Sequence, residues 1–180
     1  PVGQALVNKA QRVLERAEEF ELLGQQLAVG NEPYVRIAFD ASIPIRLISE
    51  VLKQCEADFP ETSLELFAEN LFGVTERLTE GEADLAVVAS FEENHLYRTL
   101  PLRKFKFYPV AAATHPLNQY ECDVPFEDTK DYVQVVLRDS ARNAPEQTYR
   151  VIEEARQWRV NDVQTKKEII VEGLGWGTLP

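Results

Sequence analysis

The sequence predicts an α/β protein organised around a parallel sheet, and three observations support this fold class. Residues 34–90 alternate between strand-like and helix-like segments in the order β-α-β-α-β. Residues 83–89 (ADLAVVA) form an almost continuous apolar run, which is typical of a parallel strand buried on both faces. Apolar residues make up 44% of the 180 residues, which is enough to build a core. Such alternation predicts parallel strands joined by right-handed crossovers.

The spacing of apolar residues assigns the segments of this unit and of the chain that follows it. Residues 34–39 (YVRIAF) and 63–68 (SLELFA) alternate as strands do. A helix is expected over residues 43–59, with Ser42 as its N-cap and Pro44 tolerated in its first turn. The other expected elements are a helix at 72–80, extended segments at 97–102 and 105–113, strands at 132–137 and 157–160, and a helix at 163–172.

Ahead of this unit, residues 2–28 are expected to form one long helix, and residues 1–30 are assigned as a linker and dimerisation helix. Its small and apolar residues recur in alternating steps of four and three, which is the heptad spacing of a coiled-coil seam. A narrow seam favours dimerisation over packing on the same domain, although both remain open. The seam consists of Leu6, Ala10, Val13, Ala17, Phe20, Gly24 and Leu27.

The charge distribution excludes a direct grip on nucleic acid by this chain. The net charge is −11, and residues 31–90 carry four basic and twelve acidic side chains, a net of −8. Nucleic-acid binding needs clustered Lys and Arg to displace counterions, and no segment offers such a cluster. No apolar run is long enough to cross a membrane, and no signal peptide is visible, so a cytoplasmic protein is expected. Cys55 and Cys122 lie far apart and are expected to be reduced.

No catalytic constellation is evident. His95 and His115 are the only histidines, and the sequence lacks G-x-S-x-G, H-E-x-x-H and phosphate-binding glycine motifs. No catalytic residue, cofactor or metal site is therefore assigned.

Four local strings, in this order behind the long helix, resemble LysR-type transcriptional regulators. They are "VRIAFDASIPIRLISEVLKQCEADFPETSLEL", "LTEGEADLAVVA", "VAAATHPL" and "IIVEGLGWGTLP". The resemblance implies a periplasmic-binding-protein-like (type 2) fold of two subdomains, with residues 34–107 as the first and 108–180 as the second. The second subdomain is expected to be incomplete, because the tail that follows "LP" in the family is absent.

The same resemblance implies function. Such a chain would be the effector-sensing region of a homodimeric or homotetrameric regulator, with a small-molecule effector in the cleft between the subdomains. Promoter DNA would be contacted through an N-terminal winged helix-turn-helix, which this sequence does not contain. A solute-binding protein of the same fold is the alternative, but the heptad helix and the lack of an export signal argue against it. An enzyme is the third class, and the sequence offers no nucleophile for it.

Physical reasoning places candidate effector contacts at the carboxyl ends of parallel strands, where helix N-termini favour anions. Some have structural alternatives: Ser42 and Asn70 as helix caps, Arg138 as a solvated surface charge and Trp176 as a core aromatic. Arg138 would suit an anionic effector because guanidinium groups bind carboxylates in a bidentate manner. The full candidate set is Ala41, Ser42, Ile43, Asn70, Ser90, Arg138, Ser140, Trp176, Gly177 and Thr178.

Overall fold

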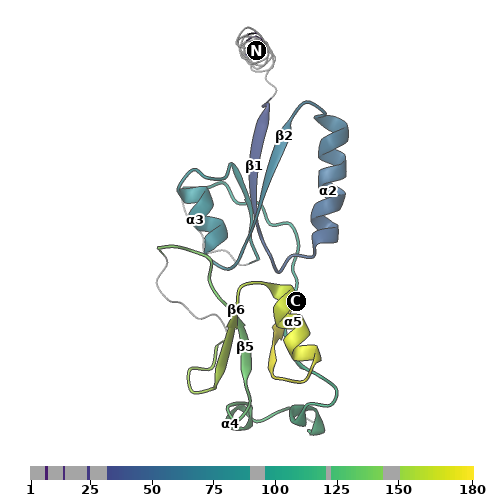
Figure 1. The fold of residues 1–180 in the computed structure, drawn as a ribbon, viewed down its shortest axis with the longest axis vertical. Helices are drawn as coiled ribbons and strands as arrows, with labels where there is room; N and C mark the ends of the chain where they lie inside the picture. Colours follow the sequence, from purple (N-terminus) through teal and green to yellow (C-terminus); the bar gives the residue numbers. More distant parts are fainter. Residues whose placement is uncertain are drawn as a thin grey trace.

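The computed structural model describes Val7, Leu14, Gly24 and residues 32–89, 96–120, 123–143 and 151–180. Two sheets, each with helices beside it, are stacked along the long axis of the molecule (Figure 1). The first subdomain contains β1, α2, β2, α3 and β3, and the second contains β4 to β7 with α4 and α5. The two-subdomain architecture is thus as expected, whereas the boundary between residues 107 and 108 stays a prediction.

The first subdomain follows the predicted β-α-β-α-β order. Strands β1 (Tyr34–Asp40), β2 (Ser63–Glu69) and β3 (Leu85–Val87) form a parallel sheet in the order β2-β1-β3. Helices α2 (Ile45–Asp58) and α3 (Gly73–Thr79) are the crossovers. In this parallel sheet the carboxyl ends of β1 and β2 lie level, since Asp40 pairs with Glu69.

Two predictions about these elements are wrong. Ser42 does not cap α2, which begins at Ile45 behind Pro44 and has no side-chain cap. Instead, the Ser42 N–H donates to the Asp40 carboxylate at 2.8 Å. This hydrogen bond stabilises a turn that precedes the helix. The run 83–89 is also not buried throughout, because β3 is at the edge of the described sheet and Leu85 is 57% exposed.

The second sheet has the order β4-β7-β5-β6. Strands β5 (Gln134–Leu137), β6 (Gln157–Val160) and β7 (Trp176–Leu179) are parallel where they pair, and β4 (Tyr108–Ala111) runs antiparallel to β7. Helix α5 (Val163–Val171) packs on this sheet, and its N-cap Asp162 accepts the Thr165 N–H at 2.7 Å. The remaining helical elements are a 3₁₀ turn (Pro116–Gln119) and the short α4 (Phe126–Thr129).

The sequence analysis did not assign strand β7 and treated Trp176, Gly177 and Thr178 only as candidate effector contacts. The glycines of this segment let β7 approach its neighbours closely. A Cβ on Gly175 would lie 2.6 Å from the Val133 carbonyl oxygen, and one on Gly177 would lie 2.7 Å from that of Val135. The expected extended segment at 97–102 forms no strand.

Almost all of the predicted dimerisation seam lies outside the described residues: Leu6, Ala10, Val13, Ala17, Phe20 and Leu27. Gly24 is helical and exposed, and so are Val7 and Leu14. Dimerisation through this helix therefore stays a prediction.

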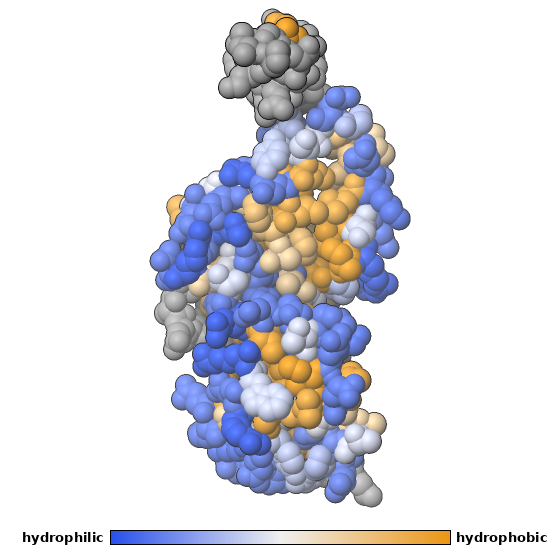
Figure 2. Space-filling view, viewed as in Figure 1, coloured by the Kyte–Doolittle hydropathy of each residue, from blue (hydrophilic) through white to orange (hydrophobic). Residues whose placement is uncertain are grey.

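An apolar hollow lies on the first subdomain between α2 and the sheet. It has a volume of about 320 Å³, and Figure 2 shows apolar residues gathered over this face. No residue of α2 is fully buried among the residues that the structure describes. The hollow is lined by Glu32, Val35, Ile37, Cys55, Glu56, Phe59, Thr62, Leu64 and Leu85.

Candidate functional site

The two subdomains meet where β2 ends, and Asn70 is at the centre of this junction. Its backbone N–H donates to the Ser140 hydroxyl at 2.9 Å, and the same hydroxyl donates back to the Asn70 carbonyl at 3.1 Å. The Asn70 side-chain amide donates to the Asn161 carbonyl at 2.6 Å. The structure therefore brings together two predicted site residues, Asn70 and Ser140, through direct hydrogen bonds.

The subdomains are in close contact at this point because Gly73 lacks a side chain. A Cβ on Gly73 would lie 2.0 Å from the Ser140 hydroxyl oxygen and 3.1 Å from the Glu69 carboxylate. Nothing larger than glycine fits at the start of α3 while the Asn70–Ser140 hydrogen bonds are kept.

Beside this contact are buried polar atoms without partners. Ser42 and Asn70 are each 6% exposed. Within the described part of the chain, the Ser42 hydroxyl oxygen and the Asn70 side-chain carbonyl oxygen have no hydrogen-bond partner, and neither does Oδ2 of Asp139. Because a buried polar atom without a partner is costly, such atoms are candidates to bind a water molecule or a ligand. Ser42 and Asn70 follow directly on the paired strand ends Asp40 and Glu69.

The other predicted contacts beside Ser42 are already used within the protein. The Ala41 N–H donates to the Glu69 carbonyl at 2.8 Å, and the Ile43 N–H donates to the Asp40 carbonyl at 2.9 Å. With the Ser42 N–H bonded to the Asp40 carboxylate, all three backbone N–H groups are satisfied. The side chain of Ser42, rather than this backbone, is what remains for a ligand.

On the second subdomain, the predicted contacts differ in their surroundings. Arg138 is exposed, and Trp176 is 7% exposed in a core cluster, where its ring N–H donates to the Thr129 carbonyl at 3.2 Å. Gly177 lies under Val135 and α5, and Thr178 is half-buried opposite Pro109 in β4. Trp176 thus has the contacts of a core aromatic, and its part in effector binding stays a prediction. Ser90 lies outside the described residues.

A buried lysine that the sequence analysis did not single out lies near the same junction. Lys166, on α5, is a charged side chain that is only 4% exposed. Burial lowers the pKa of Lys166 from 10.5 to about 8. The available signal was helical spacing, since Lys166 falls in the apolar stripe between Val163 and Ile170.

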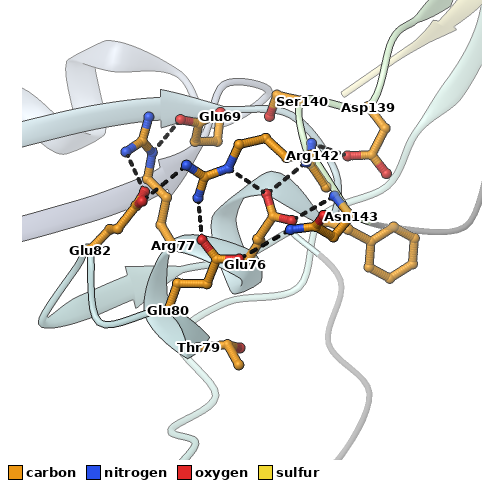
Figure 3. Close-up of polar contacts among 12 residues, drawn as sticks. Glu69, Glu76, Arg77, Thr79, Glu80, Glu82, Asp139, Ser140, Arg142 and Asn143 are labelled. Carbon is orange, nitrogen blue, oxygen red and sulfur yellow. Dashed lines mark hydrogen bonds and ion pairs between the residues drawn. The ribbon is translucent and has the colours of Figure 1, made fainter.

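Ion pairs also connect the two subdomains at another side of the junction (Figure 3). Arg142, in the loop after β5, pairs with Glu76 at 3.4 Å, with Glu82 at 3.0 Å and with Glu80. Arg77 pairs with Glu82 at 3.0 Å and with Glu69. We call the three carboxylates with Arg142 the Arg142 cluster, and it joins α3 and its following turn to the second subdomain.

Backbone N–H groups also take part in the Arg142 cluster. The N–H groups of Arg142 and Asn143 donate to the Glu76 carboxylate at 2.7 and 2.8 Å. The Arg142 N–H is the largest cause that lowers the pKa of Glu76, and the Asn143 N–H adds to it. Glu76 is therefore held in its ionised form by a loop of the other subdomain.

No group of three or more His, Cys, Asp or Glu side chains that could hold a metal ion is found within the described ranges. No helix in these ranges is long and apolar enough to span a membrane.

Comparison with known proteins agrees with this architecture. The family model described as the LysR substrate binding domain matches residues 29–180. The probable HTH-type transcriptional regulator YhaJ of Escherichia coli (strain K12) is 26% identical over 184 residues, covering 99% of this chain and 60% of that protein. The chain thus spans about 60% of the length of this curated relative.

Solved structures show the same fold. The effector-binding domain of QuiR in complex with shikimate is 17% identical with a TM-score of 0.61, covering 83% of this chain and 74% of that chain. The BenM effector-binding domain with its effector benzoate is 21% identical with a TM-score of 0.56, covering 82% and 69%.

These matches define the class as a LysR substrate-binding domain with the fold of type 2 periplasmic binding proteins. The chain belongs to the LysR substrate-binding domain family, as the four sequence strings had implied.

Proposed function

We propose that this chain is the effector-sensing region of a LysR-type transcriptional regulator and that it binds a small molecule at the junction between the two subdomains. The observation that carries the proposal is the pair of buried, unpartnered atoms on Ser42 and Asn70, at the carboxyl ends of parallel strands. Ligands of α/β sheets bind at such strand ends. The related domains of QuiR and BenM are described with shikimate and benzoate, two small carboxylates, which supports an effector of similar size.

Regulation would follow from a change in the relative position of the subdomains. An effector acts only through its different affinities for two arrangements, and Asn70, Ser140 and Asn161 already link the two sides. We propose that this bias passes through a dimer or tetramer to winged helix-turn-helix domains that bind promoter DNA in the cytoplasm. The relatives named as regulators favour this reading over a solute-binding protein.

The ligand site is tested by thermal unfolding of the chain with a panel of small carboxylates and neutral analogues. A ligand that binds only the folded state adds about 2.7 kcal/mol of stability at one hundred times its Kd. Ser42→Ala should abolish the shift without lowering the melting temperature of the free protein, because its hydroxyl has no partner there.

Ser49→Ala is the matched control, since the Ser49 hydroxyl donates within α2, to the Ile45 carbonyl at 2.9 Å. It should leave the ligand shift unchanged. A panel that produces no shift at millimolar concentration, or a shift that Ser42→Ala leaves intact, contradicts the proposed site.

A further inference from the structure

Among the described residues of the second subdomain, Lys166 is the one buried cation. Lys166 is on the first turns of α5, and its backbone N–H donates to Asp162, the N-cap. Asn161, the preceding residue, accepts the side-chain hydrogen bond of Asn70 from the first subdomain. The amino end of α5 is therefore part of the junction, and Lys166 lies about one turn inside it.

Helix geometry directs the stem of Lys166 toward the junction. Side chains of an α-helix lean toward its N-terminus, which for α5 is the end beside Asn70. The stem crosses β7 at Gly177, where an added Cβ would lie 2.9 Å from Cε of Lys166. Since β7 runs parallel to β5, whose carboxyl end leads to Ser140, the strand at this point also runs toward the junction.

Burial makes the charged form of the Lys166 amine unfavourable. It accordingly lowers the pKa of Lys166 to about 8. Asp162, four residues earlier, accepts hydrogen bonds from Thr165 at both of its oxygens, and no carboxylate among the described residues opposes the effect of burial on the pKa of Lys166. The protein thus keeps a positive charge at pH 7 for which the described residues offer no counter-charge.

The other groups at the junction complement this charge. The amino end of α5 has the positive end of a helix dipole, which favours anions. The free hydroxyl of Ser42 can donate to a carboxylate, while the free side-chain oxygen of Asn70 needs a donor. A small carboxylate that also carries a hydroxyl group provides both.

We propose that the Lys166 amine is the counter-charge for the carboxylate of the effector, which is a small hydroxy-substituted carboxylate. This inference rests on the proposed function, because it names the ligand class of that same site. It replaces Arg138, the exposed residue that the sequence had suggested for this role, with a residue that water does not screen.

The test measures binding of four acids, each paired with its primary amide, by calorimetry. The probes are benzoate, 4-hydroxybenzoate, shikimate and lactate. We expect an acid to bind and its amide to bind at least about tenfold more weakly, because a hydrogen bond to a charged group is lost. We expect the hydroxy acids to bind more tightly than benzoate.

Variants separate this inference from the proposed function. Lys166→Met should weaken the acid about tenfold or more and leave the amide unchanged, and Lys166→Arg should retain part of the acid's affinity. Lys167→Met, which changes the exposed neighbour, is the matched control and should bind as the wild type does. Circular dichroism establishes that each variant is folded, and the acid–amide comparison on the wild type does not depend on any variant.

Each outcome decides between the two proposals. Equal affinity for acid and amide, or acid binding that Lys166→Met does not weaken, overturns the role of Lys166 and leaves effector binding in place. Binding of neither member of any pair overturns both.

Discussion

The two sides of the junction between the subdomains satisfy their polar groups in opposite ways. At the Arg142 cluster every carboxylate has a basic partner, and the groups remain in contact with solvent. At the side formed by Ser42, Asn70 and Lys166, the groups are buried, and the Ser42 hydroxyl and the Asn70 side-chain oxygen have no partner among the described residues. The first side is satisfied by contacts within the protein, whereas the second offers groups that a ligand could bind. A protein with both can hold two subdomains together and still respond to a small molecule.

The largest effect is expected from removing the buried charge. Lys166→Met should raise the free energy of unfolding at pH 7 by up to about 3 kcal/mol, because a pKa of about 8 instead of 10.5 measures the cost of keeping the amine charged. Denaturant titration measures this. A destabilised but folded Lys166→Met protein would show that the amine has a partner in the free protein.

The pH dependence of stability has a definite sign. Between pH 8 and 10.5 the unfolded chain binds a proton at Lys166 that the folded chain has released, so the stability of the wild type should rise with pH over this window. Below pH 8 both states are protonated, and this contribution is constant. Lys166→Met should lack the rise, while Lys167→Met should retain it.

The next effect concerns the closest approach of the subdomains. Gly73→Ala should lower the free energy of unfolding by about 1–3 kcal/mol, because its Cβ would overlap the Ser140 hydroxyl. Adding Ser140→Gly removes the overlapping atom and should recover part of the loss. A Gly73→Ala protein as stable as the wild type would mean that the two loops are not held against each other.

Breaking the Arg142 cluster should have a smaller effect. Arg142→Ala should increase hydrogen–deuterium exchange of residues 138–143 and lower the melting temperature slightly, more in low salt than in high salt, because the ion pairs are exposed. Arg36→Ala is the matched control, since Arg36 pairs with Asp84 inside the first subdomain at 2.8 Å. Its exchange pattern in residues 138–143 should equal that of the wild type.

The smallest effect is expected in the stability of the protein at acidic pH. The pKa of Glu76 is lowered in the folded state, so its contribution to stability is present above its ordinary pKa and is lost as the pH falls through the lowered value. Glu76→Gln should therefore flatten the acid limb of the stability curve and speed amide exchange at Arg142 and Asn143. An unchanged acid limb would show that these backbone bonds do not form in solution.

The sequence was informative wherever a local pattern determined the structure. The β-α-β-α-β order and the second-sheet strands at 134–137 and 157–160 follow from apolar spacing, and Asn70 and Ser140 were found because they follow predicted strands. Strand β7 was missed because its glycines, which indicate a loop in isolation, are required by a neighbouring strand and helix.

The partners of polar groups were harder to predict. Ser42 does not cap α2, because its N–H donates to the carboxylate of Asp40, two residues earlier, in a turn that precedes the helix. The Arg142 cluster joins residues sixty or more positions apart, so no local sequence pattern predicts it. The burial of Lys166 is likewise a property of the folded chain, because the sequence does not show that the lysine packs against β7.

Lysine-selective NMR of the Cε carbon, assigned with Lys166→Met, tests the central claim most directly, because it follows the charge on the unsatisfied side of the junction. We expect the Lys166 signal of the free chain to titrate with a pKa near 8 and to move to a higher pKa when a hydroxy acid such as shikimate is added, since an anion stabilises the charged amine. A pKa near 10.5 in the free chain, or one that no carboxylate of the panel raises, would contradict the claim that this side of the junction awaits an anionic ligand.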